Sequence, residues 1–239
     1  MKFAHTPLRL PYLLGQVSDN EIKGVGMRIL SLAFPIILAA SSAVAGPIPF
    51  GDSWNEQRLQ LFSSNDYGFN GADMSIVSDG AVSLAWSRTD QSDWNVTSAT
   101  WAWAVDQSVP ATDLSRKGGD DRNISVYFVF LPEEDAVELE GANIRRLSGN
   151  DNVRILQYVW GGSHGRGTIQ QSPYAPGQGA NVILRSAGTG SHSESVNLTN
   201  DFASAFGGSK GVLVGVAVSA DSDDTDSPIV ASVSNLVVR

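Results

Sequence analysis

The chain has 239 residues and is acidic, with 16 lysines and arginines against 25 aspartates and glutamates, and it contains no cysteine. The lack of cysteine excludes disulfides, thiol catalysis and cysteine-ligated zinc, and the formal net charge of −9 disfavours binding to nucleic acid or to an anionic membrane. Charged residues make up only 17% of the chain and 24 residues are glycine, a composition typical of short strands joined by many turns.

Residues 1–26 are expected to be a translated leader, because the segment that follows them has the features of a signal peptide, which works at the N-terminus. The codons AAA-GGA-GTN would encode residues 23–25 and would place a ribosome-binding sequence just before the codon of Met27. We therefore expect Met27 to be the true start. The alternative is a genuine N-terminal tail.

Residues 27–45 are predicted to be the signal peptide. Arg28 supplies a positive charge, residues 29–40 are apolar but too few to span a bilayer, and residues 43–45 (Ala-Val-Ala) match the small-x-small cleavage pattern. We expect residues 46–239 to be exported to the periplasm or beyond, with no integral membrane segment left after cleavage. Because residues 1–45 hold four basic and two acidic side chains, the charge of the remainder falls from −9 to −11.

Residues 46–239 have the two-residue periodicity of β-strands almost throughout. The segments that fit best are 83–87, 100–105, 124–131, 153–160, 181–186, 212–219 and 229–239. Helical patterns are confined to 54–61 and 199–206, the second followed by a Gly-Gly pair suited to end a helix. Since strands and helices do not alternate, we predict one all-β domain over 46–239, an antiparallel β-sandwich of the jelly-roll type with few short helices.

Two strands carry apolar stripes that predict the core. In 100–105, Trp101, Trp103 and Val105 share one face, because alternate side chains of a strand point the same way. In 212–219, positions 212, 214, 216 and 218 are all valine, which predicts a second continuous core stripe.

An acidic run follows the valine-rich strand. Four carboxylates lie within residues 221–226, and two adjacent aspartates precede the strand at 124. The candidate ligands are Asp221, Asp223, Asp224 and Asp226, with Asp120 and Asp121. Hard oxygen ligands at this density suit Ca²⁺ in a structural role. The spacing is not that of an EF-hand, because the sixth position is not glycine and Ser232 stands where the bidentate glutamate belongs. The alternative is a solvated acidic turn.

Aromatic and glycine-rich segments supply the other candidate ligand-binding residues. Trp94 and Tyr174 lie in polar, turn-rich surroundings and are expected to form an exposed platform for a sugar ring, whereas Trp101, Trp103 and Trp160 are expected in the core. In the glycine-rich segment 161–167, two further candidates, His164 and Arg166, would recognise a carboxylate or a hydroxyl. The alternative for 161–167 is a flexible hairpin loop.

Catalytic motifs are scarce. Neither GxSxG nor HExxH occurs, and residues 46–239 contain only two histidines, His164 and His192. A carboxylate pair of the glycoside-hydrolase kind remains an alternative, with Glu194 as one candidate beside Asp120 and Asp121. We assign no catalytic residue.

The order of several short segments resembles an exported bacterial family known as domain of unknown function 3047. The matching pieces are 101–105 (WAWAV), 113–121 (DLSRKGGDD), 126–130, 158–161 (YVWG), 172–174 (SPY), 193–194 (SE), 201–202 (DF), 205–207 (AFG) and 221–225 (DSDDT). The resemblance implies a jelly-roll similar to galactose-binding and other carbohydrate-binding modules. The chain departs from the pattern of this family at three places. Asp224 stands where the family pattern has asparagine. Segment 188–194 lacks the tryptophan of that pattern, and the stretch after Glu194 lacks its arginine.

Together these observations favour an exported, non-catalytic β-sandwich that binds a glycan or another cell-envelope polymer, with calcium as the candidate stabilising ion. The alternatives are an enzyme that acts on polysaccharide through acidic residues and a structural or assembly protein with a protein partner.

Overall fold

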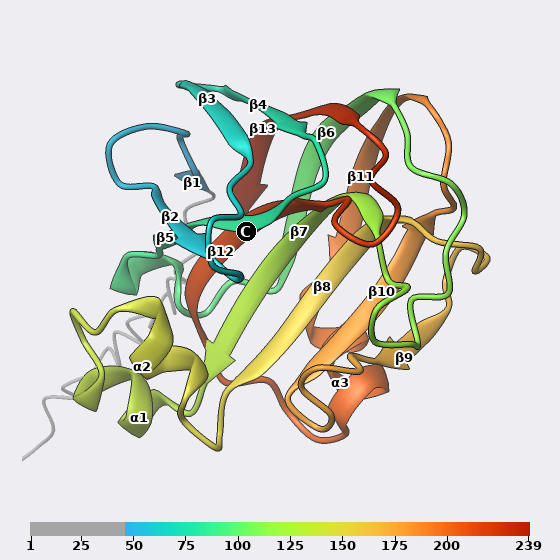
Figure 1. Cartoon of the computed structure of the whole chain (residues 1–239). Helices are drawn as coiled ribbons and strands as arrows, with labels where there is room; N and C mark the ends of the chain where they lie inside the picture. The colour runs from blue at the N-terminus through green and yellow to red at the C-terminus, as the bar shows by residue number, and fades with distance from the viewer. Residues whose placement is uncertain (1–45) are drawn as a thin grey trace, which may run out of the picture. The chain divides into compact units, whose positions relative to one another are not determined.

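Two β-sheets packed face to face form the part of the chain that the computed structural model describes, residues 46–239 (Figure 1). The predicted leader (1–26) and signal peptide (27–45) lie outside the described residues. Between residues 46 and 239, no helix has the length and apolar character needed to cross a membrane.

The six-stranded sheet is antiparallel throughout. Its strand order is β11-β6-β13-β4-β3, and a short β1 pairs with β13. The strands are β1 (Gly46–Pro47), β3 (Asp66–Asn70), β4 (Asp73–Ser78), β6 (Ser98–Gln107), β11 (Gly190–Asn197) and β13 (Ile229–Val238).

The seven-stranded sheet has the order β2-β5-β12-β7-β8-β10-β9. Its strands are β2 (Asn55–Arg58), β5 (Val82–Arg88), β7 (Arg122–Leu131), β8 (Arg154–Gly161), β9 (Ile169–Gln171), β10 (Gly179–Arg185) and β12 (Val212–Asp221). Its neighbours are antiparallel except β8 and β10, which pair in parallel. The predicted all-β sandwich is therefore confirmed, with one parallel pair inside it.

Within residues 46–239, helices are few and short, as predicted. They are η1 (Gln91–Asp93), α1 (Glu133–Glu138), α2 (Ile144–Ser148) and α3 (Leu198–Phe206). The helix predicted at 199–206 is α3, which the Asn197 side chain caps through the backbone N–H of Asn200. The helix predicted at 54–61 is wrong, because residues 55–58 pair with β5 as the edge strand β2 and tertiary pairing overrides the helical pattern.

Aromatic side chains fill the space between the sheets. Trp101 and Trp103 are each 2% exposed and Val105 is 1% exposed, so their predicted shared core face is confirmed. The Trp101 ring lies 5.6 Å from that of Tyr158, and the Trp103 ring lies 5.6 Å from that of Trp160, both between ring centres. These contacts join β6 of one sheet to β8 of the other.

The predicted single valine stripe on β12 is wrong in one respect. All four valines are buried, but the pairing of β12 with β7 shifts register between Leu213 and Gly215. Val216 and Val218 consequently point into the space between the sheets, whereas Val212 and Val214 pack beneath α1 and α2 in a separate cluster. The outer face of the seven-stranded sheet, the face turned away from the other sheet, is therefore covered at one end by α1 and α2.

Candidate functional site

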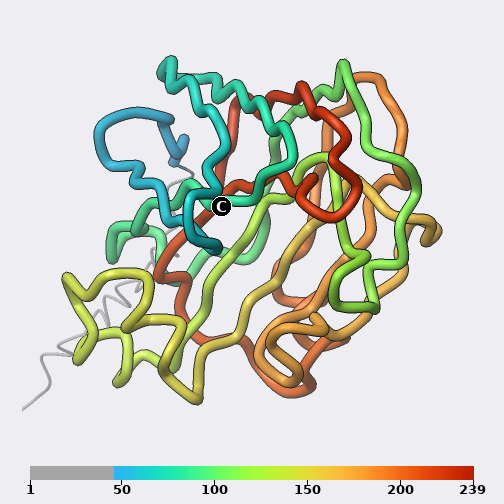
Figure 2. Tube along the Cα trace, in the orientation of Figure 1, coloured from blue at the N-terminus to red at the C-terminus, as the bar shows by residue number. Residues whose placement is uncertain are grey.

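Two acidic segments that are about 100 residues apart in the chain meet at one edge of the seven-stranded sheet. Asp221 ends β12 and lies opposite Arg122, the first residue of β7. Asp120 and Asp121 directly precede β7, so the antiparallel pairing brings them to the loop 222–228 that follows β12. Figures 1 and 2 show this loop in red beside the green segment that leads into β7.

Three carboxylates form a cluster at this edge, which we call the acidic cluster: Asp121, Asp221 and Asp223. One oxygen from each lies within 4.8 Å of the others. Asp121 is fully buried, and its two oxygens accept hydrogen bonds from the backbone N–H groups of Asp224 (3.3 Å) and Thr225 (2.8 Å). The Asp121 side chain therefore fixes the loop 222–228 around the cluster.

Asp221 is the cluster member with an unused oxygen. Its Oδ2 accepts from Arg122 Nη1 at 2.7 Å, but its Oδ1 is buried and has no hydrogen-bond partner among residues 46–239. Burial raises the pKa of Asp221 to about 8, against the lowering effect of Arg122, and the nearby Asp223 adds to the rise. A cation beside Oδ1 would satisfy this oxygen and offset the excess negative charge.

Asp120 lies next to the acidic cluster but has other partners. Its Oδ1 accepts from the hydroxyl of Tyr174 at 3.0 Å, and its Oδ2 is 3.3 Å from Arg122 Nη1. The second guanidinium nitrogen of Arg122 donates to the Tyr127 hydroxyl at 3.1 Å, and that hydroxyl is 2.7 Å from Ser219 Oγ. Hydrogen bonds thus run from the cluster onto the outer face of the seven-stranded sheet.

The structure brings together three of the six predicted metal ligands. The other three lie outside the acidic cluster. Asp120 contacts Tyr174 and Arg122, and Asp224 and Asp226 are exposed on the loop 222–228. The cluster has the donor set of a site for a hard cation, and Ca²⁺ itself stays a prediction.

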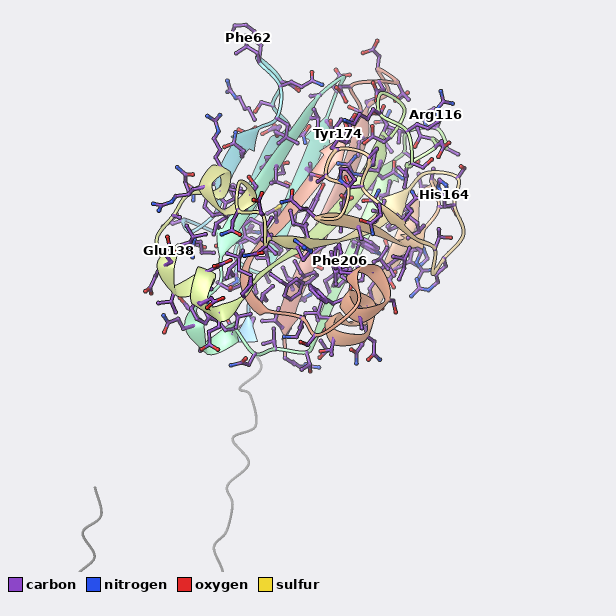
Figure 3. The ribbon with its side chains drawn as sticks, turned by 90° about the horizontal axis from the view of Figure 1, so that it is seen from below. Phe62, Arg116, Glu138, His164, Tyr174 and Phe206 are labelled. Carbon is purple, nitrogen blue, oxygen red and sulfur yellow. The ribbon has the colours of Figure 1, made fainter. Side chains whose placement is uncertain are left out.

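The predicted aromatic platform does not form. Trp94 is only 7% exposed and packs with Leu131 and Val214 in the cluster beneath α1 and α2, so its ring faces are not open to a ligand. Tyr174 is 59% exposed, as expected, and Figure 3 shows it on the surface. Its hydroxyl is held by Asp120, so Tyr174 belongs to the surroundings of the acidic cluster.

His164 and Arg166 lie in the loop after β8, and both contact acidic side chains. His164 Nε2 is 3.6 Å from Asp113 Oδ1. Arg166 Nη2 is 2.9 Å from one carboxylate oxygen of Glu194, and Arg185 Nε is 2.8 Å from the other. The guanidinium of Arg166 is therefore already paired within the chain, and ligand binding by either residue stays a prediction.

Glu194 is a poor proton donor in this arrangement. Its side chain is 1% exposed, and it also accepts a hydrogen bond from Trp103 Nε1 at 3.3 Å. Burial raises the pKa of Glu194, but hydrogen bonds from Arg166 and Arg185 outweigh burial and lower the pKa below its ordinary value. Among residues 46–239, Glu194 shares no hydrogen-bond partner with Asp120 or Asp121.

Trp86 was not predicted as a site residue, yet it is the tryptophan that the fold leaves open. The chain has six tryptophans, and five of them are between 2% and 7% exposed. Trp86 is half-buried on β5, where it lines a hollow of about 740 Å³. A signal existed in the sequence: small residues (Ser83, Ala85, Ser87) alternate with Leu84, Trp86 and Arg88, which places the large side chains together on one face.

Comparisons with known proteins give a family and distant structural similarities. No curated protein matches the chain. The xyloglucanase domain of NopAA, a type three effector from Sinorhizobium fredii, in complex with cellobiose, is 9% identical with a TM-score of 0.43, over 82% of this chain and 97% of that one.

The family 11 xylanase from Neocallimastix patriciarum is 12% identical (TM-score 0.39; 82% of this chain, 99% of that one). A family 29 carbohydrate binding module from Piromyces equi, CBM29_1, is 5% identical (TM-score 0.35; 81% and 88%). The family described as "Protein of unknown function (DUF3047)" matches residues 52–237, so the resemblance expected from the sequence is confirmed and the chain belongs to this family.

Proposed function

We propose that the protein is an exported, non-catalytic β-sandwich that binds a glycan or another cell-envelope polymer and that holds a structural Ca²⁺ ion in the acidic cluster. The observation that carries the proposal is the outer face of the seven-stranded sheet. There, aromatic rings, amides and hydroxyls lie side by side, and hydrogen bonds connect this face through Arg122 to the cluster.

The chemistry of this face suits sugars. A sugar ring offers an apolar face and a rim of hydroxyls, and binding sites for such ligands combine aromatic rings with a few polar groups that fix orientation. Trp86 and Tyr127 provide half-buried rings on β5 and β7. The acidic surface repels polyanions but does not oppose a neutral polymer.

The acidic cluster suits Ca²⁺ because its donors are hard oxygens. Ca²⁺ takes six to eight oxygen ligands and accepts water among them. Asp121, Asp221 and Asp223 would hold the ion, which would tie the loop 222–228 to the start of β7. Through Asp221 and Arg122, the ion would also keep the hydrogen bonds of the outer face in place.

Affinity electrophoresis tests the proposal. The purified protein is run through gels that contain soluble polysaccharides, once with Ca²⁺ and once with EDTA, and sedimentation with purified cell-wall sacculi covers insoluble polymer. We expect retardation or cosedimentation with at least one polymer, and weaker binding in EDTA. Binding to none of them in either condition would overturn the polymer-binding proposal.

A second candidate function, docking of a protein partner in the cell envelope, is favoured by the loop between β2 and β3. Leu59, Leu61 and Phe62 are 54%, 84% and 87% exposed, and Figure 3 shows Phe62 projecting from the body of the protein. Large exposed apolar side chains that cluster in this way are typical of interaction sites. Crosslinking from position 62 in the native envelope, followed by identification of the crosslinked species, tests this candidate; crosslinks to glycan alone would count against it.

A further inference from the structure

The hollow beside Trp86 combines a half-buried indole ring with amide side chains, the groups that a sugar ring can stack on and hydrogen-bond to. Its floor is the outer face of β5 and β2, and its far wall is the segment 141–145, which runs into the first turn of α2. We infer that this hollow binds a neutral saccharide, with the Trp86 indole stacked on a sugar ring. The inference rests on the proposed glycan binding and names the place and the chemical class of the ligand.

Trp86 has the exposure that a stacking platform needs. It is half-buried, whereas the other five tryptophans are at most 7% exposed. Residues on either side of it in β5, Ala85 and Ser87, are buried on the opposite face of the strand. The indole is therefore held on a strand that is paired on both sides, by β2 and β12, with one side of the ring open, which keeps the entropy cost of binding low.

Amide groups lie beside the Trp86 ring. Asn55 pairs with Trp86 and Gln57 pairs with Leu84 in the antiparallel register of β2 and β5, so all four side chains belong to one face. Asn55 and Gln57 both line the hollow. Each amide offers both a donor and an acceptor, which is the combination that a sugar hydroxyl requires.

The far wall is fixed to the floor. Arg88 Nη1 donates to the backbone carbonyl oxygen of Ala142 at 2.9 Å, which ties the segment 141–145 to β5. Asn143 caps α2 through its Oδ1, which accepts from the backbone N–H of Arg146 at 3.0 Å. This cap uses only the oxygen of the amide, so the Nδ2 group of Asn143 is available to donate to a ligand.

The charge and size of the hollow point to a neutral ligand. Its charged lining residues are Arg88, Arg145, Glu56 and Asp90, whose formal charges cancel, although the whole chain carries −9. A hollow that selected an anionic sugar would need an excess of cations. The volume of about 740 Å³ lies within the range of about 300–1,000 Å³ that small-molecule sites occupy.

Affinity electrophoresis of four proteins tests the inference: the wild type, Trp86→Ala, Asn55→Ala and Phe62→Ala. The gels contain neutral polysaccharides (glucan, xylan, mannan, galactan) or anionic ones (polygalacturonate, alginate). Phe62→Ala removes an exposed aromatic ring outside the hollow and is the matched control. Circular dichroism checks that each variant is folded. If Trp86→Ala does not fold, Asn55→Ala still tests the inference, because Asn55 is exposed on an edge strand and its truncation should not disturb the fold.

We expect a neutral polysaccharide to retard the wild type and Phe62→Ala equally, and Trp86→Ala to bind about tenfold more weakly or worse, the usual effect of truncating an aromatic anchor. The ligand should also perturb the tryptophan fluorescence of the wild type.

Equal binding by wild type, Trp86→Ala and Asn55→Ala would overturn the inference and leave the proposed function standing. Retardation by anionic polysaccharides alone would overturn the neutral assignment. Binding of the wild type to no glycan would instead overturn the proposed function itself.

Discussion

Arg122 and Asp221 lie opposite each other on β7 and β12, and Arg122 Nη1 donates to Asp221 Oδ2 over 2.7 Å with both side chains about nine-tenths buried. The same guanidinium also contacts Asp120 and the Tyr127 hydroxyl. One arginine therefore serves both the acidic cluster and the outer face of the seven-stranded sheet.

Replacing Arg122 should destabilise the protein strongly. Arg122→Met keeps much of the aliphatic bulk but leaves Asp221 and Asp120 buried without their cation. Removing one partner of a buried ion pair costs about 3–5 kcal/mol. Urea unfolding at about pH 9, above the pKa of about 8 of Asp221, measures this cost with the carboxylate ionised. Arg116→Met is the control, because Arg116 is exposed (Figure 3) and its loss should change the free energy of unfolding by about 0.5 kcal/mol or less. Equal effects of the two substitutions would contradict the role assigned to Arg122.

Calcium should raise the thermal midpoint of the protein, and Asp223→Asn should remove this response. A ligand that binds only the folded state stabilises it by about 2.7 kcal/mol at a hundred times its dissociation constant. In EDTA, Asp223→Asn should be neutral or stabilising, because it removes like charge beside Asp221 and Asp121. The matched control is Asp226→Asn, which lies in the same loop outside the acidic cluster and whose positive φ of 50° asparagine tolerates. An unchanged calcium response in Asp223→Asn, or its absence in the wild type, would leave the loop as a solvated turn.

Local sequence pattern was sufficient for β5, β6, β7, β8, β10, β12 and β13, because alternation or a long β-branched run is what burial there demands. It missed β4, although Met74 and Ile76 are buried there between exposed residues. It was insufficient for β11, where serines face solvent and the inward positions include His192 and Glu194. Glu194 is tolerated there because Arg166, Arg185 and Trp103 donate hydrogen bonds to its carboxylate. Such partners come from two other strands and a loop, so no window of the sequence reveals them.

The candidate site shows the same limit. The acidic run was visible in the sequence, but which of its carboxylates meet depends on the β12–β7 register, which places Asp221 opposite Arg122. The prediction for Trp94 was wrong for a related reason. Its polar neighbours in the sequence predicted an exposed side chain, but its ring is buried in the cluster beneath α1 and α2. Burial of a single side chain is decided by elements distant in the chain, and this is why Trp94 is buried against its prediction.

The ion pairs of Glu194 should give a specific acid sensitivity. Because the folded-state pKa of Glu194 is lowered from 4.5, its carboxylate contributes stability that is present above about pH 4.5 and is lost as the pH falls through the lowered pKa. Glu194→Gln should therefore be less stable than the wild type at pH 7, and the difference should shrink as the pH is taken from 5 towards 3. Urea midpoints at several pH values measure this, with the exposed Glu134→Gln as the control. A difference that stays constant with pH would show that the substitution acts through packing and not through charge.

Gly211, in the turn that enters β12, should tolerate no larger residue. A Cβ atom at this position would overlap the backbone carbonyl of Leu131 at the end of β7 and would lie 3.0 Å from the nitrogen of Pro132. Backbone atoms in a paired strand cannot move aside as a flexible side chain can, so the β7–β12 pair would have to separate at this end. Gly211→Ala should thus lower the free energy of unfolding by about 1–3 kcal/mol, the usual cost of overpacking. Gly165→Ala is the matched control, because nothing lies within 4 Å of its would-be Cβ. If Gly211→Ala proved as stable as Gly165→Ala in urea, the close approach of β12 to the end of β7 would be wrong.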